Sequence, residues 1–199
     1  MNTDEAKTTK ERIMDAALAT LRDEGIVEAS ARVIAARGGF NQALIFYHFG
    51  SVNKLLMEAC ARSSAAQVAH YREAAAGARS LIDLVDIARR LHDDDQKSGS
   101  VTVLTQLMAA SVSDPEMGKA VLDGFLGWIK LVEDSLTQAL EGSPLAGLIP
   151  VREAAYAIAA VFLGIELMER LDPERSEANE VFAAMAYVAQ LVEGFMKEP

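Results

Sequence analysis

The chain has 199 residues, of which 51% are hydrophobic, enough for one large core or for a small domain beside a larger one. Its one cysteine, Cys60, excludes an internal disulfide and a cysteine-rich zinc site. The formal net charge of −10 is unevenly spread, because residues 1–62 carry eight basic and eight acidic side chains and the whole excess of acids lies in residues 63–199.

The acidic remainder repels DNA, so any nucleic-acid binding is expected in the N-terminal part. The first residues lack the basic start and apolar run of a signal peptide. The most apolar uncharged stretch, residues 154–165, has twelve residues, well short of the roughly 20 that span a bilayer. These features predict a soluble cytoplasmic protein.

Helical periodicity and helix-end signals recur along the whole chain, and no segment alternates with a period of two. For example, Thr8 and Glu11 have the spacing of a capping box, and Gly25 ends the helix that follows. The expected helices cover about residues 8–24, 32–37, 41–49, 51–77, 80–96, 101–112, 114–140, 151–171 and 173–197. The sequence therefore predicts an all-α protein of about nine helices.

Residues 30–56 predict two short helices joined by a tight turn and followed by a third helix. Ser30 is a good N-cap, and Gly38-Gly39 ends the first short helix. Ile45 and Phe49 lie one turn apart on the second short helix and can be buried together. The side chains left pointing outward are Asn41, Gln42, Leu44, Tyr47 and His48. This pattern is typical of a helix-turn-helix whose second helix enters the DNA major groove.

Residues 9–56 resemble the N-terminal domain of the TetR family of bacterial transcriptional regulators. The resemblance is carried by IMDAALATLRDEG at residues 13–25 and by ASARVIAARGGFNQALIFYHFGSVNKLL at residues 29–56. It implies a helix-turn-helix DNA-binding domain over residues 1–56 and a larger helical domain for ligand binding and dimerisation over residues 57–199. It further implies a homodimer that binds a DNA operator and a small-molecule effector, with no enzymatic activity.

The resemblance also implies which residues contact DNA. These are Arg32, Asn41, Gln42, Ala43, Leu44, Tyr47, His48 and Lys54. Gln42, Ala43 and Leu44 occupy base-facing positions, and Tyr47 and His48 occupy phosphate-facing ones. Val52 stands where many members have a lysine, and Lys54 is a candidate replacement for its charge. Leu44, where many members have threonine, is expected either to meet a thymine methyl group or to pack sideways against the domain.

A second set of residues predicts an effector pocket in the larger domain. It comprises Leu104, Met108, Phe125, Trp128, Phe162 and Glu166, with Gln106 and Met168 as further neighbours. Core packing is the competing explanation for each apolar member. Because Glu166 ends a strongly apolar run, its carboxylate reaches water, pairs with another group, or faces a pocket. A largely apolar effector with one basic or donor group is expected.

The last two expected helices are apolar on more than one face, which predicts a four-helix dimer interface built from two helices of each subunit. The expected contact residues are Ala155, Ala159, Gly164, Met185, Ala189 and Val192.

No other motif predicts catalysis, a cofactor or a metal. His48, His70 and His92 have no metal-site spacing, and Cys60 lies on an apolar face. The run at residues 93–95, three aspartates, is expected to be a solvated helix face. The sequence thus predicts a ligand-responsive dimeric repressor with a near-palindromic operator. The alternative is a helical module that binds a small molecule or a protein without binding an operator.

Overall fold

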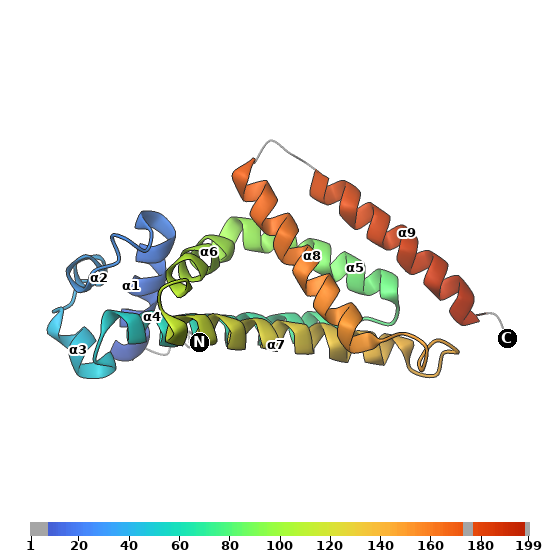
Figure 1. Cartoon of the computed structure of the whole chain (residues 1–199), viewed down its shortest axis with the longest axis horizontal. Coiled ribbons are helices and arrows are strands. Elements are labelled where there is room, and N and C mark those ends of the chain that lie inside the picture. Colours follow the sequence, from blue (N-terminus) through green and yellow to red (C-terminus); the bar gives the residue numbers. More distant parts are fainter. Residues whose placement is uncertain (1–7, 173–176, 198–199) are drawn as a thin grey trace, which may run out of the picture. The chain divides into compact units, whose positions relative to one another are not determined.

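The computed structural model describes residues 8–172 and 177–197, and these contain nine helices and no strand (Figure 1). The helices are α1 (Thr9–Glu24), α2 (Ala31–Gly38), α3 (Ala43–Phe49), α4 (Val52–Ala75), α5 (Leu81–Ser98), α6 (Ser100–Ser111), α7 (Pro115–Leu140), α8 (Val151–Leu171) and α9 (Glu177–Lys197). The all-α prediction is confirmed. The predicted start of the last helix at Pro173 lies outside the described residues.

Short polar side chains begin the helices at the predicted positions. The Thr8 hydroxyl accepts the Glu11 N–H while the Glu11 carboxylate accepts the Thr8 N–H, which is a complete capping box. Ser51 Oγ accepts the Lys54 N–H at 3.1 Å, and Asp114 Oδ1 accepts two N–H groups in the first turn of α7. These caps satisfy backbone donors that have no partner inside the helix.

The chain forms two compact units. The first unit comprises the residues up to Ser64 together with Thr102–Gly124, and the second comprises Ala65–Val101 together with the residues from Phe125 onward. Helices α4, α6 and α7 therefore contribute residues to both units. Within residues 8–172 and 177–197, no helix combines the length and hydrophobicity needed to cross a bilayer.

The core of the first unit is built from branched aliphatic side chains of successive helices. The fully buried residues are Ile13, Leu21, Ile34, Ile45 and Leu55. They come from α1, α2, α3 and α4, so each short helix is held by its own buried anchor. Because α2 and α3 have only eight and seven residues, this packing rather than helix propensity keeps them folded.

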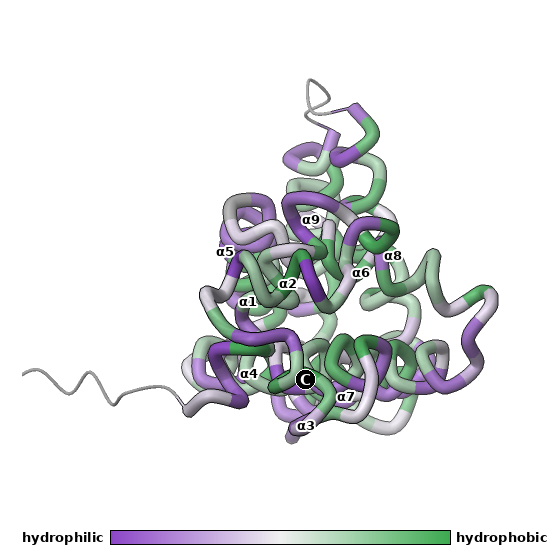
Figure 2. The backbone as a smooth tube through the Cα atoms, turned by 90° about the vertical axis from the view of Figure 1, so that its left-hand side faces the viewer, coloured by the Kyte–Doolittle hydropathy of each residue, from purple (hydrophilic) through white to green (hydrophobic). Residues whose placement is uncertain are grey.

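In the second unit, α9 packs along α5, where the Glu193 carboxylate accepts the Ile82 N–H at 3.1 Å. Helices α4 and α7 also lie side by side in this unit, since a Cβ at Gly127 would make an ordinary van der Waals contact, at 3.8 Å, with a Val68 methyl group. Polar and apolar residues alternate along the helices of both units, as Figure 2 shows. The pattern is that of amphipathic helices around buried cores.

Candidate functional site

The turn between α2 and α3 is a Schellman motif, which fixes how the chain leaves α2. Gly39 has φ of 66°, in the left-handed region that glycine enters without strain. The Phe40 N–H donates to the Ala35 carbonyl at 3.1 Å, and the Gly39 N–H donates to the Ala36 carbonyl at 3.4 Å. Both bonds satisfy carbonyls at the end of α2, so the start of α3 is set by the backbone.

One side of α3 is anchored and the other faces solvent. Ile45 is fully buried and Phe49 is 5% exposed, whereas Tyr47 is 82% exposed. Gln42 and Ala43 are also exposed. A seven-residue helix held along one side can thus present the other side to a groove.

Three predicted contact residues are partly buried or already hydrogen-bonded within the chain. Leu44 and His48 are half-buried, and the His48 ring packs edge-on to Tyr47 with centroids 4.9 Å apart. Asn41 Oδ1 accepts the Ala43 N–H at 2.9 Å. The Asn41 side chain therefore helps to start α3, and its Oδ1 already accepts a hydrogen bond.

Most basic side chains of the first unit are held by carboxylates. Ion pairs join Lys10 to Glu58, Arg22 to Asp23, Arg37 to Asp23 and Glu24, Arg62 to Asp15, and Lys119 to Asp123. Among the described residues of this unit, Arg12, Arg32 and Lys54 have no carboxylate within ion-pair distance, and all three are exposed. Two of the three are predicted DNA contacts, so these charges are available to an external anion.

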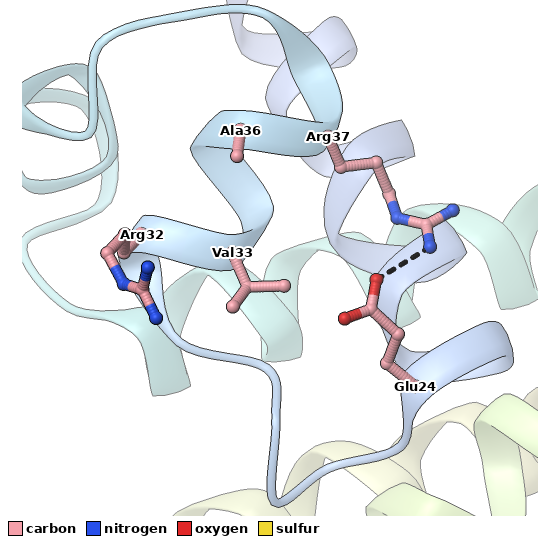
Figure 3. A pocket seen from close by; sticks show the side chains of 5 residues that line it. All are labelled: Glu24, Arg32, Val33, Ala36 and Arg37. Atoms are coloured by element: carbon pink, nitrogen blue, oxygen red, sulfur yellow. Dashed lines mark hydrogen bonds and ion pairs between the residues drawn. The ribbon is translucent and has the colours of Figure 1, made fainter.

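A shallow, open hollow of about 370 Å³ lies beside α2 (Figure 3). Glu24, Arg32, Val33, Ala36 and Arg37 line it. The Arg37 guanidinium is turned to Glu24, with Nη2 2.7 Å from Oε1, while Arg32 lies at the other end of α2. Arg32 is therefore the cation of this hollow that can meet a phosphate.

The second unit contains a buried ring of polar side chains between α5 and α8. His92 Nδ1 lies 2.5 Å from Glu166 Oε1, and His92 Nε2 lies 2.8 Å from Glu169 Oε2. The Gln96 amide donates to both carboxylates at 3.1 Å. A protonated imidazole donates from both nitrogens, so His92 and Gln96 can supply one donor each to Glu166 and Glu169.

The His92–Glu166 pair lies in apolar surroundings, where an unpaired charge would be costly. His92 is 5% exposed and Glu166 is 1% exposed, and the rings of Phe162 and Phe182 pack on the imidazole. Burial raises the pKa of the Glu166 carboxyl, and the hydrogen bond from His92 opposes that rise. Of the three outcomes expected for Glu166, pairing is the one observed. The pairing partner, His92, was not predicted.

A neighbouring network links α5 to α4. Asp95 accepts the Tyr71 hydroxyl at 2.7 Å, and the Tyr71 ring packs on Trp128 with centroids 4.7 Å apart. The prediction that residues 93–95 form a solvated face is wrong for Asp95, which is 7% exposed, and right for Asp93 and Asp94, which are exposed. Position 95 falls on the inward stripe of α5, one turn after Leu91, which explains its burial.

Replacing Asp95 tests this burial through the pH dependence of stability. Burial raises the pKa of the Asp95 carboxyl above its ordinary value of 3.8, against the opposing hydrogen bond from Tyr71. Its contribution to stability is therefore fully present below that ordinary value and is lost as the pH rises through the raised folded-state value. We expect Asp95→Asn to gain stability relative to the native chain between pH 4 and pH 7 in urea unfolding.

Asp93→Asn, which removes an exposed carboxylate two residues away, corrects that comparison for the change in net charge. A difference between Asp95→Asn and the native chain that stays constant with pH would contradict the proposed burial cost.

The predicted effector residues divide between the two units. Leu104 and Met108 belong to the first, and Phe125, Trp128, Phe162 and Glu166 belong to the second. Gln106 is hydrogen-bonded within the first unit, where its Oε1 accepts the Ile26 N–H at 3.1 Å. Met168 is 68% exposed. Cys60 is half-buried, and burial raises the pKa of its thiol.

The faces of α8 and α9 differ from those expected for an interface. Ala155 and Ala189 are 0% and 6% exposed within one chain, so their methyl groups have almost no surface to offer a partner. Ala159, Met185 and Val192 are half-buried, and Gly164 has open space at its Cβ position. Large apolar side chains are exposed along both helices instead: Tyr156, Val161, Met168 and Leu171 on α8, and Tyr187, Val188, Leu191 and Phe195 on α9.

Comparison with known families bears on the first unit. Residues 13–59, which contain most of α1 and all of α2 and α3, match the family model described as bacterial regulatory proteins, tetR family. Residues 13–59 therefore resemble the DNA-binding domain of the TetR family. The matched segment holds Gln42, Tyr47 and Lys54, so the resemblance seen in the sequence is confirmed. A search among curated protein sequences gave no match.

Solved structures resemble this chain over 89–94% of its length. The fatty acid degradation regulator FadR from Bacillus halodurans is 16% identical, with a TM-score of 0.73 over 92% of this chain and 95% of that one. A putative TetR-family regulator from Mesorhizobium loti is 18% identical, with a TM-score of 0.76 over 94% and 98%. NemR from E. coli, in its reduced form, is 17% identical, with a TM-score of 0.73 over 89% and 95%. At these identities the likeness establishes the fold alone.

Proposed function

We propose that this protein is a ligand-responsive transcriptional regulator of the TetR family, acting in the cytoplasm as a dimeric repressor that a small molecule releases from its operator. The observation that carries the proposal is the exposed side of α3, with Gln42, Ala43 and Tyr47, in a unit whose Arg32 and Lys54 have no carboxylate partner among the described residues. Repression rather than activation follows the analogy with the family.

The exposed side chains divide into those suited to contact bases and those suited to contact phosphates. The Gln42 amide can form a bidentate pair with adenine in the major groove. Arg32, Tyr47, His48 and Lys54 carry groups suited to phosphates, which fix the register of the protein on the duplex but carry little sequence information. Two copies of α3 related by a two-fold axis require a near-palindromic operator with half-sites about one helical turn apart or a multiple of that.

For the effector we propose a site in the second unit, near Phe125, Trp128, Phe162 and Glu166. Aromatic side chains from α7 and α8 favour a largely apolar ligand. Glu166 is already hydrogen-bonded to His92 and Gln96, so a basic or donor group of the ligand would have to replace one of these partners. Release of DNA requires that the ligand bind two conformations with different affinities.

Dimerisation is proposed through the exposed apolar faces of α8 and α9. Gly164 and Val161 on α8 and Val188 and Leu191 on α9 lie on these faces. A patch repeated on two adjacent helices suits a two-fold contact in which each helix of one subunit meets its counterparts in the other.

A salt titration tests operator binding by this surface. Operator duplexes are first selected from genomic fragments by the full-length protein, and affinity is then measured on operator and scrambled DNA. We expect Lys54→Ala to flatten the slope of log K against log salt by roughly 1.8 per dimer, since each neutralised phosphate contributes about 0.9. Gln42→Ala should keep the slope and relax base preference in each half-site, at a cost of about 1–3 kcal/mol against the wrong base.

Lys119→Ala is the matched control, because Lys119 is an exposed lysine of the same unit that is paired with Asp123. Its slope should equal that of the native protein. An unchanged slope for Lys54→Ala would show that Lys54 does not replace the lysine absent at Val52. Failure to select any duplex would favour the alternative of a helical binding module that uses no operator.

A further inference from the structure

Phe46 is a large apolar side chain left in solvent on the shortest helix. It is 51% exposed, whereas its neighbours Ile45 and Phe49 are buried. The described aromatic rings pack in several pairs, including Tyr47 with His48 and His48 with Phe49, but none of these contacts includes Phe46. The core of the unit therefore does not account for the position of this ring.

The neighbours of Phe46 along α3 are candidate base readers. Phe46 follows Gln42 by four residues and Ala43 by three, so the three side chains lie on adjoining parts of the helix surface, with about 5–6 Å between Cβ atoms. That spacing corresponds to one or two base-pair steps. A phenyl ring has no hydrogen-bonding group for a phosphate, and the apolar feature that the major groove presents is the C5 methyl group of thymine.

We infer that Phe46 reads a thymine methyl group in each half-site, one or two base pairs from the adenine read by Gln42. The inference rests on the proposed function and names a specificity determinant within it. It also decides between the two roles considered for Leu44. Leu44 is half-buried while Phe46 is half in solvent, so Leu44 packs on the domain and Phe46 meets the methyl group.

Uracil substitution in the operator isolates the methyl group, because an A·U pair keeps every hydrogen-bonding group of an A·T pair. The probe is a duplex selected from random DNA by the native protein, compared with the same duplex carrying deoxyuridine at every thymine of both half-sites. Burying one methyl group contributes about 0.8 kcal/mol. We therefore expect a loss of affinity of about fourfold per half-site, or roughly fifteenfold for the two.

Phe46→Ala should bind the thymine and uracil duplexes equally, because the group that senses the methyl is gone. Leu44→Ala is the matched variant and should keep the preference for thymine. Unchanged affinity of Phe46→Ala for scrambled DNA shows that the domain is folded.

Three results would overturn the inference. Equal binding of both duplexes by the native protein would show that no methyl group is read. Phe46→Ala retaining the preference while Leu44→Ala loses it would assign the methyl to Leu44. If the native protein enriches no duplex at all, the proposed function fails first and the inference falls with it.

Discussion

Val188→Glu and Gly164→Arg are expected to convert the proposed dimer into 21.4 kDa monomers. Val188 is 56% exposed on α9, and a Cβ at Gly164 on α8 meets no atom within 4 Å, so both new side chains fit the single subunit. In a two-fold interface each substitution occurs twice. Burying an unpaired polar or charged group costs at least about 2 kcal/mol per copy, which raises the dimer dissociation constant by roughly a thousandfold. Sedimentation velocity over a range of protein concentrations measures the change.

Val112→Glu is the matched control, since Val112 is 90% exposed and lies outside α8 and α9. It should sediment as the native protein does. Far-ultraviolet circular dichroism distinguishes folded monomers from unfolded chains. Ala189→Glu is not a suitable interface variant, because Ala189 is 6% exposed within the subunit and a carboxylate there would disturb the core. Unchanged dimers for both Val188→Glu and Gly164→Arg would exclude these faces as the interface.

The succession of helices can be predicted because their ends carry local chemical signals. Thr8, Ser51 and Asp114 accept backbone N–H groups in the first turn of α1, α4 and α7. Gly25 and Gly39 end α1 and α2 with positive φ. Each signal depends on residues within four positions of one another, so one sequence is enough to read it.

The inward faces of α8 and α9 could not be predicted, because the middle sections of both helices, residues 154–165 and 181–189, contain no charged or amide side chain. When the apolar residues surround a helix, a period of 3.6 residues no longer singles out one face. The expected contacts Ala155 and Ala189 therefore turned out to be buried, while Tyr156 and Tyr187 are exposed. Which face is buried depends on helices far away in the sequence.

The polar ring on α5 and α8 joins residues 74 positions apart, and no local pattern pairs them. A partial signal existed on α5. The apolar stripe through Ala88 and Leu91 continues to His92 and Asp95, which places both polar side chains on the buried side. That stripe could have indicated the burial of His92 and Asp95, but not that Glu166 and Tyr71 are their partners.

Removing His92 should cause a large loss of folding stability in the second unit. His92→Leu takes away the donors to Glu166 Oε1 and Glu169 Oε2 and leaves the Glu166 carboxylate, 1% exposed, with only Gln96 as a donor. Breaking a buried pair by deleting one partner costs about 3–5 kcal/mol, because the remaining charge stays desolvated. Urea unfolding at a fixed subunit concentration measures this loss.

His70→Leu is the matched control, because His70 is an exposed histidine on α4 and should change stability by no more than about 0.5 kcal/mol. The double substitution His92→Leu with Glu166→Leu removes both charged partners and fills the site with apolar groups. Such replacements are often neutral, so the double variant should be more stable than His92→Leu alone. The stabilities combine as a double-mutant cycle, in which a coupling near zero would mean that His92 and Glu166 do not depend on each other. A loss for His92→Leu no greater than that for His70→Leu would likewise contradict the paired arrangement.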